Sequence, residues 1–414
     1  MPSHYTRSIV LMSACLVASS ASAADPPAVS EQARRVHFSG LLFDGHNDLP
    51  WQLREDGDVT FTRLDISKRL SSGHTDIPRA REGGLKAQFW SVYVPSEQPH
   101  AARAVTDQID IVHRMVERYP DDLEMAYTAD DVERIVKAGK IASLIGIEGG
   151  VAIENDLAQL RMFHKLGVRY MTLTHNTTLD WADAAMDAPR HNGLTPFGER
   201  VVKEMNRLGM LVDISHVAPS TMADALRISQ APVMASHSSA FAIAPSPRNV
   251  PDDILKRVAT NGGVVMVNFF SGFIVPEAAN QLVEANKKLK AEHPRPAEYS
   301  KAFEAWLKAH PISRGTIGNV VDHIDHIVKV AGIDHVGIGS DFDGITVWPE
   351  GLDDVSCFPR ITEELLKRGY SESDVHKILG GNILRVFREA GRVADRLRKT
   401  TQPEVDQPPP EKKH

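Results

Sequence analysis

The sequence predicts an α/β fold, a (β/α)₈ TIM barrel, from three observations. Eight short apolar runs recur along the chain, segments long enough for helices separate them, and polar side chains follow at least five of the runs. Strands that are buried on both faces are apolar without alternation, and eight strand–helix units are the number that closes a parallel barrel. A doubly wound open sheet is the alternative, but it would gather its polar residues at a single switch point.

The expected strands are the apolar runs themselves, which in chain order are GLLFDG, AQFWSVYV, ASLIGIEG, YMTLTH, GMLVDISH, PVMASH, GGVVMVNFF and HVGIGSDFDG. Between them, residues 107–120, 156–167 and 196–209 have helical patterns. The last two patterns end in a glycine, which suits a helix C-cap. Each helix would return the chain to the start of the next parallel strand.

Two additions to the barrel are expected. Residues 274–315 follow the seventh strand and are rich in charge, which predicts inserted helices. We expect a solvated surface insertion, because charged helix faces usually meet water, and a binding role near the mouth of the barrel is the alternative. After the eighth strand, Ser371 and Asp374 have capping-box spacing and begin a helical C-terminus.

The N-terminus has the pattern of a secretory signal. Arg7 precedes an apolar centre that ends in the cleavage sequence Ala21-Ser22-Ala23. The apolar centre is shorter than the ~20 residues that span a bilayer, so we expect no membrane span after signal removal. The protein is then secreted or periplasmic. A lipoprotein anchored through Cys15 is the weaker alternative, because Met12 fits the residue three before such a cysteine poorly.

Four segments follow from these patterns. The predicted organisation is a signal peptide (1–23), an N-terminal extension (24–36), a (β/α)₈ metallohydrolase domain (37–395) and a disordered polar tail (396–414).

Composition excludes several classes of protein. The chain has 414 residues, of which 42% are hydrophobic and 24% charged, as in ordinary globular domains. Its net charge of −7 argues against nucleic acid as a partner. Only Cys357 remains once the signal is removed, so the fold is not a disulfide scaffold.

Titratable side chains follow most of the expected strands, and these candidates are His46, Asp48, Glu148, His175, His216, His237, Asp341 and Asp343. Alternate residues of a strand share one face, so His46 and Asp48 point together. A closed barrel brings its strand ends into one bowl, where these side chains converge. Burying them without partners would be costly, and divalent cations supply the missing charge.

Imidazole and carboxylate ligands without thiolate suit Zn²⁺ or a related first-row metal. Five ligands exceed the three protein ligands that one catalytic zinc usually takes, so two metals fit better. One carboxylate would bridge them, and a shared hydroxide would be ready to attack an ester, amide or phosphoester.

The motifs DGHND, GIEGG, LTHN, SHV, SHSSAFAIAPSPRNVPDD and GSDFDG occur in this order between about Leu41 and Phe387. They closely resemble the membrane dipeptidase (renal dipeptidase-like) family, peptidase family M19. The resemblance implies a barrel of the metal-dependent hydrolase type with two Zn²⁺ per chain. It also implies hydrolysis of small dipeptides with a free C-terminal carboxylate, including L-Xaa-D-Xaa, by a metal-bridging hydroxide. Members are often dimeric, which leaves a homodimer open.

The resemblance also assigns roles to individual residues. The implied metal ligands are His46, Asp48, Glu148, His216 and His237, with Glu148 shared by both ions. Arg248 in PRNVP would hold the substrate carboxylate, and His175 would bind substrate and steady the developing oxyanion. Asp341 would handle the proton. Trp51 either lines the pocket or packs in the core.

These roles are chemically reasonable. An arginine fork binds a carboxylate through two parallel hydrogen bonds, and a carboxyl group can accept a proton and return it to the leaving amine. The alternative for Arg248 is a salt bridge to Asp252 or Asp253. The chain lacks the lipid-anchor signal and extra cysteines of animal members, which favours a bacterial secreted or periplasmic form.

Two other functions remain open at this point. One is a metal-dependent amidase or a lactone or phosphoester hydrolase on the same barrel, and the other is a secreted metal- or peptide-binding protein without activity. A serine hydrolase is excluded, because no G-x-S-x-G motif occurs in the chain.

Overall fold

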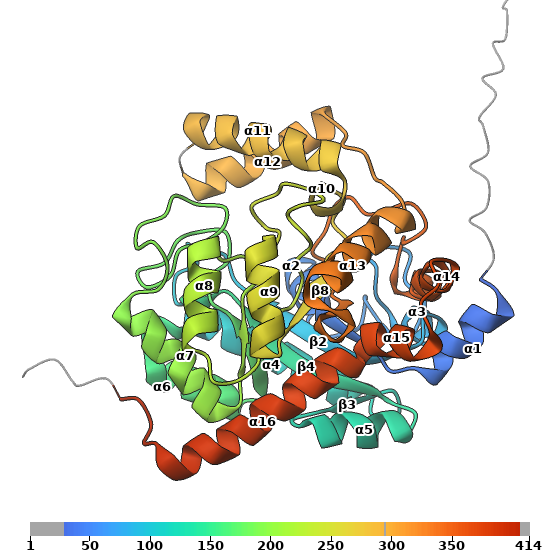
Figure 1. The fold of residues 1–414 in the computed structure, drawn as a ribbon, viewed down its shortest axis with the longest axis horizontal. Coiled ribbons are helices and arrows are strands. Elements are labelled where there is room, and N and C mark those ends of the chain that lie inside the picture. The colour runs from blue at the N-terminus through green and yellow to red at the C-terminus, as the bar shows by residue number, and fades with distance from the viewer. Residues whose placement is uncertain (1–28, 294, 406–414) are drawn as a thin grey trace, which may run out of the picture.

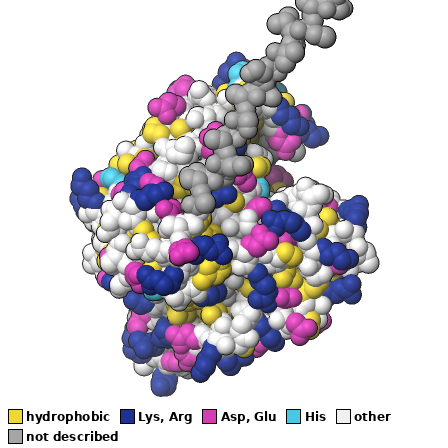
Figure 2. All heavy atoms as spheres, turned by 90° about the vertical axis from the view of Figure 1, so that its right-hand side faces the viewer, with side chains coloured by type: hydrophobic (Ala, Val, Ile, Leu, Met, Phe, Trp, Pro, Cys, Tyr) yellow, Lys and Arg dark blue, Asp and Glu magenta, His cyan; other side chains and the backbone are white. Residues whose placement is uncertain are grey.

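The computed structural model describes residues 29–293 and 295–405. The predicted signal peptide and the last part of the predicted tail lie outside these residues and stay predictions. Within the described part, no helix is long and apolar enough to cross a membrane. Figure 2 shows acidic and basic side chains interspersed over the face that it presents.

Eight parallel strands form a closed ring in chain order, which confirms the predicted barrel. They are β1 (Leu42–Asn47), β2 (Leu85–Tyr93), β4 (Ile141–Glu148), β5 (Val168–Thr172), β6 (Leu211–Asp213), β7 (Met234–Ala235), β8 (Val264–Val267) and β9 (Val336–Ile338). Each of them overlaps one of the eight apolar runs. β1 pairs with both β2 and β9, and β2 also pairs with β4, so the ring has no free edge and the open-sheet alternative is wrong. A short strand outside the ring, β3 (Leu123–Met125), pairs in parallel with the first residues of β4.

Helices surround the ring as the strand–helix alternation predicts (Figure 1). Those between barrel strands include α2 (Leu49–Glu55), α3 (Ile77–Glu82), α4 (Ala101–Arg118), α5 (Ala129–Lys137), α6 (Leu157–Lys165), α7 (Pro196–Leu208), α8 (Pro219–Ile228), α9 (Asp252–Asn261) and α13 (Ile317–Ala331). The three helices expected from periodicity correspond to α4, α6 and α7. Gly209 ends α7 with a φ of 82°, the left-handed conformation that favours glycine at a C-cap.

The remaining helices lie at the ends of the chain or decorate the barrel. They are α1 (Glu31–Ser39), α10 (Ser271–Ile274), α11 (Pro276–Glu292), α12 (Pro296–Ala309), α14 (Pro359–Lys367), α15 (Glu372–His376) and α16 (Asn382–Thr400). Short 3₁₀ turns occur at Gly150–Ile153, Ile333–His335 and Val355–Cys357, and a π turn at Lys377–Gly381. The inserted helices after the seventh barrel strand, β8, are α11 and α12, as predicted.

Aromatic packing fills the barrel and closes one of its ends. Phe43 of β1 stacks on Phe89 of β2 with ring centroids 5.2 Å apart. Phe89 in turn meets Phe387 of α16 edge-on at 6.3 Å. α16 therefore covers one end of the barrel, and Figure 1 shows α11 and α12 at the opposite end of the molecule.

Two predicted domain boundaries differ from the structure. α1 begins at Glu31, so part of the expected N-terminal extension is already helical. α16 continues to Thr400, past the expected domain end at 395, because buried Leu397 prolongs its apolar face. Beyond the helix, Glu404 pairs with Arg200 at 3.2 Å, so the predicted tail starts too early in the sequence.

Candidate metal centre and substrate pocket

The predicted titratable residues lie at the carboxyl ends of the barrel strands, on one rim of the barrel. His46 lies in β1, and Glu148 is the last residue of β4. His216 and Asp341 follow β6 and β9 in the left-handed region, with φ of 64° and 63°. Such φ values are uncommon for residues other than glycine and often occur at functional sites.

The titratable residues at the rim form three overlapping clusters of three. Within each cluster, the possible ligand atoms lie within 4.8 Å of one another. The clusters are His46–Glu148–His237, Glu148–His175–His216 and His46–Asp48–Asp341. Each residue predicted to bind metal is therefore in the group, together with His175 and Asp341.

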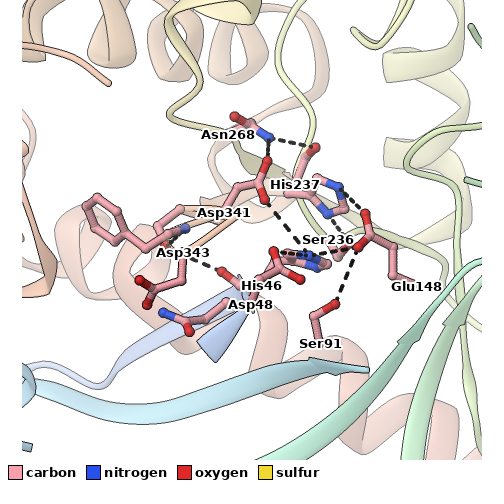
Figure 3. Close-up of polar contacts among 12 residues, drawn as sticks. His46, Asp48, Ser91, Glu148, Ser236, His237, Asn268, Asp341 and Asp343 are labelled. Carbon is pink, nitrogen blue, oxygen red and sulfur yellow. Dashed lines mark hydrogen bonds and ion pairs between the residues drawn. The ribbon is translucent and has the colours of Figure 1, made fainter. Parts of the chain in front are cut away.

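The carboxylate of Glu148 faces the imidazoles of His46 and His237 (Figure 3). Its Oε2 lies 3.5 Å from His46 Nε2, while its Oε1 lies 3.0 Å from His216 Nε2 and 3.5 Å from His237 Nε2. Asp48 Oδ2 approaches His46 Nε2 at 3.2 Å. The two oxygens of Glu148 thus face different histidines, which is the position that a shared carboxylate needs.

The second nitrogen of each imidazole is held by a neighbouring polar group. The Nδ1 partners are Tyr170 Oη for His46 at 2.8 Å, Ser236 Oγ for His237 at 2.7 Å and Asn176 Oδ1 for His216 at 3.1 Å. Metal-binding histidines are commonly oriented in this way. All three Nε2 atoms are left pointing to the centre of the cluster.

The protonation pattern of His216 and His237 fits a bound cation. Ser236 Oγ donates to Asp213 at 2.6 Å, so it accepts the Nδ1 proton of His237. The amide oxygen of Asn176 likewise accepts from His216. Burial lowers the pKa of both histidines well below its usual value, so both are neutral. Their Nε2 lone pairs then face each other across 2.8 Å, an arrangement that a cation between ligands relieves.

His46 provides a second sign of a metal site. Its Nε2 is buried without a hydrogen-bond partner in the described part of the chain. Burial acts to raise the pKa of Glu148, yet His46 and His175 hold it well below its usual range, so this carboxylate is charged. Imidazole nitrogens with an ionised carboxylate are the donor set that a first-row divalent metal prefers, and the residues present fit such a group.

Asp341 lies beside the cluster in a setting suited to proton transfer. Its Oδ1 is 4.0 Å from His46 Nε2, and its Oδ2 accepts a hydrogen bond from Asn268 Nδ2 at 2.7 Å. Burial raises the pKa of Asp341 to about 8. A carboxyl group with a pKa near neutrality can both bind and release a proton at working pH. Asp343, by contrast, accepts the backbone N–H of His74 at 2.7 Å, away from the cluster.

Arg248 is a buried cation with no carboxylate partner among the described residues. Its guanidinium donates only long hydrogen bonds, to Ser238 Oγ at 3.3 Å and to the His237 carbonyl at 3.2 Å. Its Nε has no partner there, and burial lowers its pKa to about 10. Asp252 pairs with His326 at 2.7 Å instead, so the alternative of a structural salt bridge is wrong.

A cavity of about 520 Å³ joins Arg248 to the clusters, and its wall also includes His175, Glu148 and Asp341. Trp51 lines it and meets Tyr93 edge-on at 4.9 Å, so the pocket alternative for Trp51 is confirmed. Pockets that bind small molecules have volumes of ~300–1,000 Å³. The cavity is large enough for a dipeptide beside the metal cluster.

The family model for membrane dipeptidase (peptidase family M19) matches residues 30–401. The chain belongs to this family. Membership in the membrane dipeptidase family makes it a hydrolase of the metallo-dipeptidase type, and the predicted resemblance is confirmed.

Solved structures agree with membership in the membrane dipeptidase family. The probable dipeptidase PvdM from Pseudomonas aeruginosa is 28% identical with a TM-score of 0.76, over 88% of this chain and 98% of that one. A metallopeptidase from Rhodobacter sphaeroides, bound to a phosphinate mimic of L-Ala-D-Ala, is 26% identical with a TM-score of 0.68. That match covers 84% of this chain and 99% of the other.

Several polar residues that surround the metal-binding clusters were not predicted from the sequence. They are Tyr170, Asn176, Asp213 and Asn268, which form hydrogen bonds to the candidate ligands, to Ser236 or to Asp341. Asn176 directly follows His175, so proximity in the motif was an available signal. Tyr170 and Asn268 lie far from their partners along the chain, and no local pattern pointed to them.

Proposed function

We propose that this protein is a dinuclear zinc dipeptidase that hydrolyses small dipeptides with a free C-terminal carboxylate. The observation that carries the proposal is the unpaired, buried Arg248 in the wall of the cavity that also contains the metal-binding clusters. An uncompensated buried charge is costly, so a protein retains one where a ligand supplies the opposite charge.

Two Zn²⁺ ions would be held by His46, Asp48, Glu148, His216 and His237, with Glu148 contacting both. When bound, such a metal pair polarises a carbonyl group and lowers the pKa of a water molecule. The positions of the two Glu148 oxygens, facing different histidines, support the shared role.

The chain's own residues would position the substrate and move the proton. Arg248 would bind the C-terminal carboxylate through the donors that the protein leaves free. His175 lines the cavity, and burial lowers its pKa, so its neutral ring can donate a hydrogen bond to the scissile carbonyl. Asp341 would accept the proton of the attacking water and return it to the leaving amine.

The burial of Arg248 supports a limit on substrate length. Its side chain is 1% exposed, so the carboxylate must enter the cavity to reach it. A longer peptide would place an amide where the carboxylate belongs. The similar Rhodobacter sphaeroides enzyme binds a mimic of L-Ala-D-Ala, and on that likeness we include dipeptides with a D-residue second.

A metal count combined with a substrate panel tests the proposal. We expect two zinc ions per chain by elemental analysis, hydrolysis of dipeptides, loss of activity with a chelator and recovery with Zn²⁺. Absence of bound metal, with none taken up on reconstitution, would overturn it. Cleavage of N-acyl amino acids with no action on dipeptides would instead favour the amidase alternative.

We also propose that the mature protein is secreted or periplasmic, on the basis of the signal pattern in residues 1–23. N-terminal sequencing of protein from the periplasm or culture medium should find cleavage after Ala23. An uncleaved cytoplasmic chain would contradict it.

A further inference from the structure

The inserted hairpin of α11 and α12 turns one face toward the candidate active site. Leu282 and Asn286 of α11 line the same cavity as Arg248, as do Phe303 and Leu307 of α12. Residues four apart lie on one side of a helix, so each helix presents a continuous strip to the cavity. The expectation of a merely solvated surface insertion is therefore wrong, because this face forms part of the pocket wall.

An apolar surface connects Arg248 to the hairpin. The Arg248 guanidinium carbon lies 5.2 Å from the centre of the Phe273 ring. Phe273 meets Phe270 edge-on at 4.8 Å. A Cβ added to Gly272 would come within 2.1 Å of Leu282 and 2.5 Å of Phe270. The side chains of Leu282 and Phe270 therefore both lie directly against Gly272. The surface thus runs from the guanidinium through the two phenylalanines onto α11.

The hairpin is held in place over the cavity by its own contacts. Tyr299 of α12 donates a hydrogen bond to Asn286 of α11, and its ring stacks on Phe303 at 5.9 Å. Lys290 of α11 donates to the carbonyl of Met186, which belongs to the loop after β5 and also lines the cavity. The wall is therefore built before substrate arrives.

The geometry of an amino acid places its side chain close to its carboxylate. The β-carbon lies about 2.5 Å from the carboxylate carbon, because two bonds of about 1.5 Å separate them. A C-terminal residue bound through Arg248 must therefore place its side chain in the immediate surroundings of that guanidinium. Phe273 is there already, and the apolar surface continues from it.

We propose that Phe270, Phe273, Leu282, Phe303 and Leu307 form a subsite, here called the apolar wall, for the side chain of the C-terminal residue. The enzyme then prefers dipeptides that end in a bulky apolar residue over those that end in glycine or alanine. This inference rests on the proposed function. An apolar pocket discriminates by about 10-fold or more for each methylene group it holds, so a preference of at least 10-fold is expected.

The test compares kcat/KM for Ala-Leu and Ala-Phe with that for Ala-Gly, using the full zinc-loaded chain. Phe303→Ala should lower the ratio of kcat/KM for Ala-Phe to kcat/KM for Ala-Gly about 10-fold. Trp306→Ala is the matched control, since Trp306 lies on the same helix, stacks on His310 at 4.7 Å and is not part of the cavity wall. It should leave the ratio unchanged.

Leu282→Ala provides a second measurement from the other helix, in case the α12 variant fails to fold. A wild-type enzyme without preference, or a ratio that Phe303→Ala and Leu282→Ala leave unchanged, would overturn the apolar wall alone. Inactivity of the metal-loaded wild type toward every dipeptide would overturn the proposed function and the apolar wall together.

Discussion

Replacing Arg248 with methionine should separate a binding role from a structural one. Arg248→Met removes the charge and retains an apolar side chain of similar length. The free protein loses two long hydrogen bonds, to Ser238 and His237, which contribute about 1 kcal/mol each. The substitution also removes an unpaired buried charge, which destabilises the free protein by several kcal/mol. The free energy of unfolding should therefore stay the same or rise.

The effect on catalysis should be large and opposite in sign. Hydrogen bonds to charged groups contribute about 1.5–3 kcal/mol each, so a carboxylate held by two of them loses about 3–6 kcal/mol in Arg248→Met. Because 1.4 kcal/mol corresponds to a factor of ten, kcat/KM for dipeptides should fall about 10²- to 10⁴-fold. Arg248→Lys keeps the positive charge but lacks the planar guanidinium that binds a carboxylate through two hydrogen bonds. Its kcat/KM for dipeptides should therefore lie between the values of the wild type and Arg248→Met.

The assay measures kcat/KM for a dipeptide and for its C-terminal amide, together with thermal unfolding. The wild type should favour the acid, and Arg248→Met should lose that preference. Arg79→Met is the control, because Arg79 is also buried but pairs with Asp76 at 2.6 Å and Asp354 at 3.3 Å. Breaking that pair should cost about 3–5 kcal/mol of stability. Equal destabilisation by both variants, or unchanged kcat/KM in Arg248→Met, would refute the reasoning.

Three further predictions concern proton transfer, ligand orientation and acid stability. Asp341→Asn should lower kcat about 10²- to 10⁴-fold with KM nearly unchanged, since an amide cannot accept the proton. Steady-state kinetics check this, and a loss confined to KM would contradict it. Tyr170→Phe removes the partner of His46 Nδ1 and should weaken metal binding about 10- to 100-fold, as measured by competition with a chelator. Unchanged affinity would show that the hydroxyl does not orient the ligand. Burial lowers the pKa of His323 from 6.5 to about 4, so below pH 6.5 the unfolded chain binds a proton that the folded chain refuses. Stability should therefore fall on acidification, by about 2 kcal/mol at pH 5 from this group. Urea unfolding at pH 7 and pH 5 measures this loss, and the free energy of unfolding of His323→Gln should fall by about 2 kcal/mol less than that of the wild type. Equal losses in the two proteins would show that His323 does not contribute to the acid sensitivity.

The strands and the rim residues were predictable because their signals are local. A barrel strand is buried on both faces, so its apolar run contrasts with its neighbours along the chain. A polar residue at the end of such a run, such as Glu148 after ASLIGI, must lie at the rim of a parallel barrel. For the same reason His46 and Asp341 were found without knowledge of any contact.

The surroundings of those residues depended on the closed barrel. Tyr170 reaches His46 only because β5 and β1 contribute to the same interior, and no pattern in either segment names the other. The sequence left a salt bridge from Arg248 to Asp252 open, since the partner of an arginine depends on how the loops pack. The charged surface of the α11–α12 hairpin likewise concealed that its other face covers the pocket.

The chain's hydrophobic pattern thus established the number and order of the barrel strands and the residue types at the rim, because burial acts on each segment separately. Closure of the ring and docking of the hairpin decided which side chains stand behind the ligands and which surround Arg248. These contacts join residues that are distant in the chain, and they arise from the packing of the whole barrel, which no single segment encodes.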